Sequence, residues 1–370
     1  MRIGCPKEIK NQEYRVGMRP DAAREAVNHG HEVLIETGAG IGSGFDDADY
    51  EAAGATILSS AEAVFDEAEM IVKVKEPQAV ERKMLRKGQL LFTYLHLAPD
   101  EPQTRDLLES GVTAIAYETV TQPGGGLPLL APMSEVAGRL APQVGSWALQ
   151  KANGGRGVLL GGVPGVTPGR VVVLGGGVVG TQAARIAAGM GANVTVLDRS
   201  LPRMRYLDDA YRGVFDTCYS TAGAVAEYIA QADMVVGAVL IPGAAAPKLV
   251  TREHLSLMKP GAVLVDVAID QGGCFETSKA TTHDDPIYEV DGIVHYCVAN
   301  MPGAVARAST MALGNATMPF MLKLADLGWR EACKQDPHLA EGLNTHEGQL
   351  TNLAVGEALG IDAVEPSAVL

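Results

Sequence analysis

The sequence predicts an α/β protein with two doubly wound domains, each a parallel sheet with helices on both faces. Apolar strand-like runs alternate with helix-like runs from the first residues onward, as in MRIGCP (1–6) and HEVLIE (31–36), and this alternation is typical of a parallel sheet covered by helices. A glycine-rich strand-to-helix turn at 175–180 lies near the middle of the chain. The length of 370 residues favours two hydrophobic cores over one.

The residues up to about 125 form one predicted α/β unit, which has no phosphate-binding glycine pattern. Helix-like segments at 21–29, 46–53 and 60–67 separate its strand-like runs. We expect parallel strands at 1–6, 31–36, 55–58, 70–75, 89–95 and 112–118.

The middle of the chain begins with a hinge or crossover, GGGLPLLAP (124–132). A long helix is expected at 133–153, in which Pro142 either introduces a kink or marks the true start, because proline lacks an N–H donor and clashes with the preceding turn. Strand-like runs then continue the α/β alternation. They are the segments 171–174, 193–198, 234–240, 262–270 and 293–302.

The C-terminal stretch from about Ala306 reads as helical, through 311–329 and 346–360, without a new strand pattern. We therefore expect it to pack back on the first domain. The nucleotide-binding domain (129–305) would then be inserted into a discontinuous substrate domain (1–128 and 306–370). Since two-domain proteins commonly hold ligands between their domains, the active site is expected in the intervening cleft.

The turn at 175–180 has the features of a dinucleotide-binding fold of the Rossmann type. Val171–Leu174 reads as a buried strand, and Gly175, Gly177 and Gly180 form G-x-G-x-x-G ahead of a helix-like segment. The first glycine permits a tight turn, the second lets backbone N–H groups approach a pyrophosphate, and the third allows close packing of helix on strand. The helix N-terminus then favours the anion.

The next strand ends on Asp198, at the distance expected for a residue that binds the adenosine ribose. Its carboxylate would accept hydrogen bonds from both ribose hydroxyls and repel a 2′-phosphate, which favours NAD over NADP, although Arg199 weakens that preference. The alternative is a glycine-rich turn of some other α/β protein, which leaves Asp198 unexplained.

Composition excludes several classes of partner. The formal net charge of −14 argues against nucleic acid and anionic membranes, which an acidic surface does not attract. The sequence has no run of eighteen apolar residues, and its opening residues MRIGCPKE lack the pattern of a signal peptide. We therefore expect a cytoplasmic protein with small-molecule substrates.

The cysteines are odd in number and far apart, and none has C-x-x-C spacing, so neither a disulfide framework nor a metal site is expected. They read as small buried hydrophobic residues at Cys5, Cys218, Cys274, Cys297 and Cys333.

Several long segments resemble the alanine dehydrogenase family, which also includes NAD-binding transhydrogenase components. The resemblance covers essentially the whole chain and keeps the family's order. It implies an enzyme that interconverts L-alanine and pyruvate with NAD, ammonia and water, usually as a homohexamer. The segments are GCPKEIKNQEYRV (4–16), KVKEP (73–77), FTYLHLA (92–98), LPLLAPMSEVAGRLA (127–141), GGRGVLLGGVPGV (154–166), GAVLVDVAIDQGGCFE (261–276), VANMPGAV (298–305) and THEGQLT (345–351).

Four residues carry the chemistry that this resemblance implies. Arg15, which alone would read as a solvated surface charge, would clamp the substrate carboxylate with a planar fork. Lys75, after an apolar strand, would hold the carboxylate or the carbonyl oxygen, unless it only pairs with Glu76 on the surface; nearby Lys73 reads as structural. His96 and Asp270, both expected at strand ends, would act as acid and base.

For His96 alone, a structural role would be the first expectation, and the family match reverses it. Asp270 ends the predicted strand 262–270 and would border the nicotinamide, whereas Asp266 reads as structural. Hydride would pass from Cα of alanine to the cofactor, and the two residues would handle the protons of water and ammonia. Further nucleotide contacts are implied by the resemblance alone, at Ser134, Val178, Val179, Arg203, Ser220, Val239, Leu240, Val267, Ala268, Ile269, Asp270, Lys279, Val298, Ala299, Asn300 and Met301.

Two alternatives stay open. One is the NAD(H)-binding component of a proton-translocating transhydrogenase, which docks on membrane partners and has no amino-acid chemistry. The other is a dehydrogenase for a different amino acid, such as lysine or its adducts, because pocket volume cannot be read from the sequence.

Overall fold

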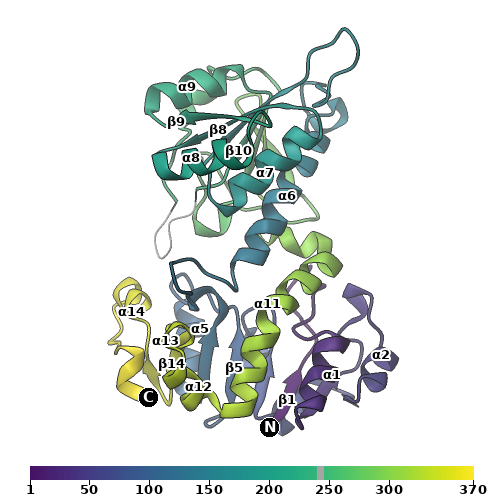
Figure 1. Ribbon diagram of the computed structural model, residues 1–370, viewed down its shortest axis with the longest axis vertical. Helices are drawn as coiled ribbons and strands as arrows, with labels where there is room; N and C mark the ends of the chain where they lie inside the picture. Colours follow the sequence, from purple (N-terminus) through teal and green to yellow (C-terminus); the bar gives the residue numbers. More distant parts are fainter. Residues whose placement is uncertain (240–245) are drawn as a thin grey trace. The chain divides into compact units, whose positions relative to one another are not determined.

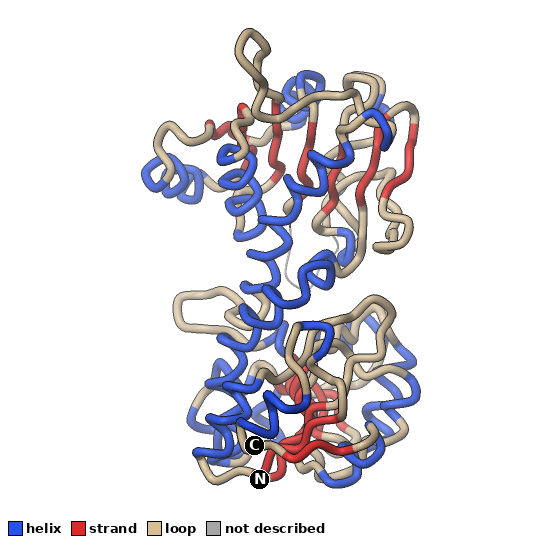
Figure 2. Tube along the Cα trace, turned by 90° about the vertical axis from the view of Figure 1, so that its right-hand side faces the viewer, coloured by secondary structure: helices blue, strands red, loops and turns tan. Residues whose placement is uncertain are grey.

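The computed structural model describes residues 1–239 and 246–370, and its chain forms two compact units. The first unit comprises residues 1–133 and 305–370, and the second comprises residues 134–304. In each unit the strands form a twisted sheet with helices on both faces (Figures 1 and 2). Two parallel-dominated sheets confirm the predicted fold class.

The sheet of the first unit runs in the order β15-β14-β6-β5-β4-β1-β2-β3. The neighbours from β6 to β3 are all parallel, so this part has the 3-2-1-4-5-6 order of a Rossmann-type sheet. Its strands are β1 (Arg2–Cys5), β2 (Glu32–Glu36), β3 (Thr56–Leu58), β4 (Met70–Val72), β5 (Leu90–Thr93), β6 (Thr113–Ala116), β14 (Leu343–His346) and β15 (Gln349–Leu350).

Helices cover this sheet and begin where side chains accept their first N–H groups, as at the N-caps Asp46, Ser60 and Asp100. One core cluster joins Leu91 and Ala114 of the sheet to Phe65 and Leu107 of the helices. The helices are α1 (Pro20–Asn28), α2 (Asp47–Ala52), α3 (Ala61–Glu67), α4 (Ala79–Arg82), α5 (Glu101–Ser110), α11 (Ala306–Leu327), α12 (Trp329–Gln335), α13 (Pro337–Ala340) and α14 (Leu353–Leu359), with 3-10 turns η1 (Ile41–Ser43), η2 (Tyr117–Thr119) and η6 (Pro366–Val369).

The expectation that the C-terminal stretch is helical without a strand is wrong between 343 and 350. There β14 pairs antiparallel with β6, and β15 pairs antiparallel with β14. Glu347 and Gly348 have φ values of 46° and 85° and form a two-residue hairpin turn, the backbone geometry that suits the twist of antiparallel strands. The helical expectation is met only later, where Asn352 caps α14.

The sheet of the second unit runs in the order β12-β13-β11-β10-β7-β8-β9. From β13 to β9 the strands are parallel, again in the 3-2-1-4-5-6 order, and the order reverses between β7 and β10. The strands are β7 (Arg170–Leu174), β8 (Asn193–Asp198), β9 (Asp216–Tyr219), β10 (Met234–Gly237), β11 (Val263–Asp266), β12 (Ile287–Val290) and β13 (Ile293–Tyr296).

The long helix expected at 133–153 is α6 (Ala131–Ala148), which contains Pro142 in its interior, so Pro142 does not mark its start. It ends earlier than expected, and a separate turn η3 (Lys151–Asn153) follows. The remaining elements are α7 (Val178–Gly189), α8 (Leu201–Ala210), α9 (Ala222–Gln231), α10 (Arg252–Leu255), η4 (Ile269–Gln271) and η5 (Met301–Val305). Within the described residues, no helix has the length and apolar character needed to cross a membrane.

Candidate active site

The glycine-rich turn joins β7 to α7 in the second unit, as predicted. Gly175 has φ +99°, and an ideal Cβ on Gly180 would lie 1.7 Å from the Gly175 oxygen, so both positions require glycine. Gly177 is the N-cap of α7 without a side-chain hydrogen bond, and a Cβ there would meet nothing within 4 Å. The first turn of α7 therefore presents N–H groups to open space, which fits the pyrophosphate of a dinucleotide.

Asp198 at the end of β8 lies beside this turn. Its Oδ2 accepts from the Gly176 N–H at 2.6 Å and its Oδ1 from the Ser200 N–H at 2.7 Å. Arg203 of α8 donates to the Gly176 oxygen at 2.6 Å and to Thr181 Oγ1 at 2.7 Å. Ser220 donates its N–H to the Asp198 carbonyl at 2.9 Å. A carboxylate and a guanidinium thus frame the glycine-rich turn.

Most other expected nucleotide contacts follow the carboxyl ends of the parallel strands, where doubly wound sheets bind ligands. Val239 follows β10, and a Cβ on Gly175 would lie 2.9 Å from its Cγ2. Leu240 lies outside the described residues. Exposed Lys279 lies farther along the chain, and its N–H donates to Tyr288 Oη at 2.7 Å. The others are Val178, Val179, Val267, Ala268, Ile269, Val298, Ala299, Asn300 and Met301, with Ser134 on α6.

Asp270 is exposed in the turn η4. The expectation that it ends a strand is wrong, because β11 stops at Asp266. The side chain of Asp266 is fully buried and accepts N–H groups from the residues that follow, which turns the chain out of the sheet.

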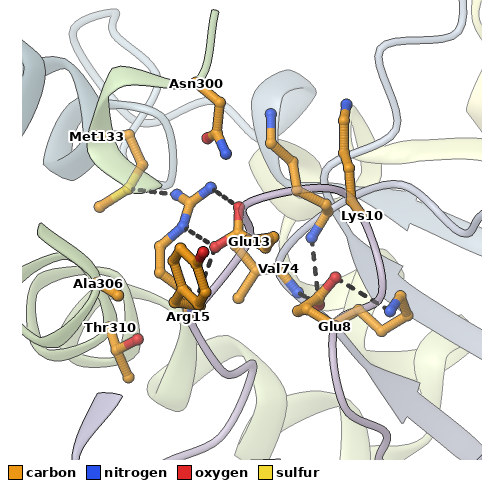
Figure 3. Close-up of polar contacts among 12 residues, drawn as sticks. Glu8, Lys10, Glu13, Arg15, Val74, Met133, Asn300, Ala306 and Thr310 are labelled. Atoms are coloured by element: carbon orange, nitrogen blue, oxygen red, sulfur yellow. Dashed lines mark hydrogen bonds and ion pairs between the residues drawn. The ribbon is translucent and has the colours of Figure 1, made fainter. Parts of the chain in front are cut away.

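Arg15 of the first unit is buried, with 2% of its surface exposed, so its interpretation as a solvated surface charge is wrong. Its Nε and Nη2 donate to Glu13 at 2.7 and 2.5 Å, and its Nη1 lies 3.0 Å from the Met133 sulfur (Figure 3). Burial lowers the pKa of Arg15, but the hydrogen bonds and charge of Glu13 more than offset this, so the net pKa is raised. Glu13 thus occupies one edge of the guanidinium and fixes its plane.

Lys75 follows β4, and its backbone is held by Glu8. Glu8 Oε1 accepts from the Val74 N–H at 2.6 Å and from the Lys75 N–H at 3.4 Å (Figure 3). Glu76 forms an ion pair with Lys10. Burial opposes ionisation of Glu76, but the charges of Lys75 and Lys10 lower its pKa.

Lys73 has no exposed surface and lies between two buried carboxylates. Its Nζ is 3.1 Å from Glu8 Oε2 and 2.7 Å from Glu81 Oε1. Burial lowers the pKa of Lys73, but the charges of Glu8 and Glu81 outweigh it and raise the pKa above its usual value. Lys73 therefore has the structural role expected of it. It is the buried counter-ion of Glu8 and Glu81, and Glu8 also accepts the Lys75 N–H.

Replacing Lys73 by methionine should lower the free energy of unfolding by about 3–5 kcal/mol, because it leaves two buried carboxylates without their cation. Urea denaturation followed by circular dichroism measures the change. Lys83→Met, at an exposed position after α4, is the matched control and should change stability by less than about 0.5 kcal/mol. Equal stability of Lys73→Met and the native protein would contradict the counter-ion role.

His96 follows β5 in a left-handed backbone conformation, with φ 51°. Glu118, just after β6, accepts the His96 N–H at 2.6 Å and the Leu95 N–H at 3.2 Å. The exposed imidazole stacks on Tyr94 with 5.7 Å between ring centroids. Burial raises the pKa of Tyr94 above its usual value, and the charge of Arg15 offsets this only in part.

Arg15, Lys75 and His96 all belong to the first unit and follow the neighbouring strands β1, β4 and β5 along the chain, and Asp270 belongs to the second unit. Sequence reasoning missed the carboxylates that hold them, which are the buried Glu13 and Glu8 and the partly buried Glu118. The position of Glu13, two residues before Arg15, is the signal that could have found one of them. The described residues contain no cluster of three metal-binding side chains.

Comparison with known proteins places this geometry in a family. Residues 4–137 match the alanine dehydrogenase/PNT N-terminal domain, and residues 141–353 match the C-terminal domain of the same family. The chain is 62% identical to an alanine dehydrogenase of Halomonas elongata over 370 residues, which is all of both chains.

Two solved structures agree with this match. An L-alanine dehydrogenase is 51% identical with a TM-score of 0.94, covering 97% of this chain and 99% of its own. A transhydrogenase from Sinorhizobium meliloti is 27% identical with a TM-score of 0.81, covering 96% of this chain and 100% of its own. The resemblance inferred from the sequence motifs is confirmed: the chain belongs to the alanine dehydrogenase/PNT family.

Proposed function

We propose that this protein is an NAD-dependent alanine dehydrogenase that reversibly converts L-alanine, NAD and water to pyruvate, ammonia, NADH and a proton. The observation that carries the proposal is that a dinucleotide-binding turn and a cationic site with an imidazole occur in one chain that matches an alanine dehydrogenase over its full length. We further propose that it works in the cytoplasm as a homohexamer, which light scattering can test as six times the mass of the chain.

In this proposal the first unit binds the amino acid and the second binds NAD. Arg15, held in its plane by Glu13, and Lys75 hold the substrate carboxylate and thereby orient Cα. NAD, when bound, accepts the hydride from Cα. Lys75 also stabilises negative charge on the carbonyl oxygen as pyruvate forms.

His96 and Asp270 manage the protons of the reaction. Oxidation of the amine gives an iminium. His96 and Asp270 position a water molecule and remove a proton from it, so that its oxygen attacks the iminium carbon. The same two groups then return a proton to the nitrogen so that ammonia departs. Arg15 and Lys75 supply the positive charge that these reaction steps need.

Mixing the protein with L-alanine and NAD at alkaline pH tests the function, with NADH absorbance as the readout. We expect NADH to form from L-alanine in proportion to enzyme, and lysine, glycine and serine are assayed in parallel. NADH binding without any alanine-dependent turnover would support a nucleotide-binding component of the transhydrogenase type, and preference for another amino acid would support the other alternative.

Asp198→Ala should weaken NAD binding by roughly tenfold or more, because a hydrogen bond to a charged group contributes about 1.5–3 kcal/mol. The same change should relax discrimination against NADP, since it removes the charge that repels a 2′-phosphate. Fluorescence titration with both nucleotides measures the two effects. Asp208→Asn, at an exposed position of α8, is a charge-matched control, and an unaltered NAD/NADP ratio in Asp198→Ala would refute the ribose contact.

A further inference from the structure

The loop that carries Asp270 is held by a buried carboxylate with an unusual number of donors. Asp266 at the end of β11 has no exposed surface. Its Oδ1 accepts from the Ala268 N–H at 3.1 Å, and its Oδ2 accepts from the Cys274 N–H at 2.8 Å and the Phe275 N–H at 3.4 Å. Ser278 Oγ also donates to Oδ2. The two carboxylate oxygens of Asp266 therefore bind residues near both ends of the segment 268–278.

The ammonium group of Lys248 holds the same segment by donating hydrogen bonds to carbonyl oxygens of the segment. Lys248 Nζ donates to the oxygens of Gly272, Gly273 and Phe275, the latter two at 3.0 and 3.3 Å. Three N–H groups of the segment thus bond to an anion, and three of its carbonyl groups bond to a cation. These charged side chains add to the turn hydrogen bonds within the segment and to its backbone hydrogen bonds with residues 246–250.

Close packing leaves this arrangement little room to shift. An ideal Cβ on Gly273 would lie 2.5 Å from Asp266 Oδ2, and one on Gly237 would lie 2.9 Å from the Cys274 Cβ. The exit of the loop is held as well, because Tyr288 Oη donates to the Thr277 oxygen at 2.8 Å. Asp270 itself is exposed and lies in η4, within the segment that these contacts hold.

We propose that Asp266 and Lys248 are positioning residues that together hold the 268–278 loop in the conformation in which Asp270 can act. The inference rests on the proposed function insofar as it concerns Asp270, but the holding of the loop is independent of it. Neither side chain exchanges protons with substrate. Their effect on the reaction passes through the backbone, because displacing a reacting group by about 1 Å can cost about a hundredfold in rate.

The test compares Lys248→Met and Asp266→Asn with Lys259→Met. Lys248 is exposed, so its replacement should leave a folded protein even where Asp266→Asn does not. Lys259 forms an ion pair with Asp233 at 2.9 Å elsewhere in the same unit and serves as the matched control. Hydrogen exchange of peptides that span 268–278 is measured first, without substrate or nucleotide, and steady-state kinetics second.

We expect faster exchange within 268–278 in Lys248→Met and Asp266→Asn, and not in the control. In the kinetics we expect kcat to fall by about tenfold to a hundredfold while KM for alanine changes little, as is usual for outer partners of a reacting group. Unaltered exchange in both variants would overturn the proposal, and so would faster exchange with unchanged kcat per folded molecule. If the native protein lacks alanine-dependent turnover, the proposed function fails, but the exchange measurement still decides whether the loop is held.

Discussion

Replacing His96 by alanine should lower kcat for alanine oxidation by about 10²–10⁴-fold, the range that a positioned acid or base contributes. An imidazole can both accept and donate a proton near neutral pH. The backbone conformation of His96, with φ 51°, is held by Glu118, and its ring rests on Tyr94. NADH binding should be nearly unchanged, because the dinucleotide turn belongs to the second unit.

His96→Asn is the matched variant for this experiment. Asparagine adopts the left-handed backbone conformation more readily than alanine does, so it separates loss of the imidazole from backbone strain. Both variants should be equally inactive, and His29→Ala, at a half-exposed side chain that pairs with Asp326, should keep native activity. Normal turnover in His96→Asn would remove His96 from the mechanism.

Replacing Arg15 by lysine should raise KM for pyruvate by roughly tenfold to a hundredfold. Lysine keeps the charge but cannot present two parallel donors to a carboxylate, and each charge-assisted hydrogen bond contributes about 1.5–3 kcal/mol. Lysine also loses the paired contacts of Nε and Nη2 with Glu13. Initial rates at varied pyruvate, with NADH and ammonia saturating, measure the change.

Two further variants separate substrate binding from stability. Arg15→Ala removes the ion pair of Arg15 with the buried carboxylate of Glu13 and should lower the free energy of unfolding by about 3–5 kcal/mol. Glu13→Gln keeps the guanidinium but loosens its plane, and should raise KM for pyruvate less than Arg15→Lys does. If Arg15→Lys binds pyruvate as tightly as the native protein, Arg15 serves only as the counter-ion of Glu13.

The parts of the fold that local sequence dictates were predictable. Strands such as β2 and β7 follow from continuous apolar runs, and the turn before α7 follows from glycines whose geometry admits no side chain. The β14–β15 hairpin was not predictable in this way. It depends on pairing between Leu343 and Ile115, which are far apart in the sequence, while its short strands carry little periodicity.

The same distinction between local sequence and long-range contacts applies to the candidate site. Asp198 could be proposed from its place after the glycine motif, and His96 from the family resemblance of the segment that carries it. The carboxylates that hold the site could not, because Glu118 and Asp266 act through backbone N–H groups that only the folded chain brings to them. The burial of Arg15 was missed for the same reason, since the charge of Glu13 makes that burial tolerable and pairing cannot be read from composition.

The central claim is that the hydrogen on Cα of alanine passes directly to the nicotinamide ring. The most direct test uses L-alanine deuterated at Cα, unlabelled NAD and ordinary water, with mass spectrometry of the NADH formed. We predict one deuterium in each molecule of NADH. NADH without deuterium would contradict direct transfer, and the absence of NADH would contradict the proposed reaction itself.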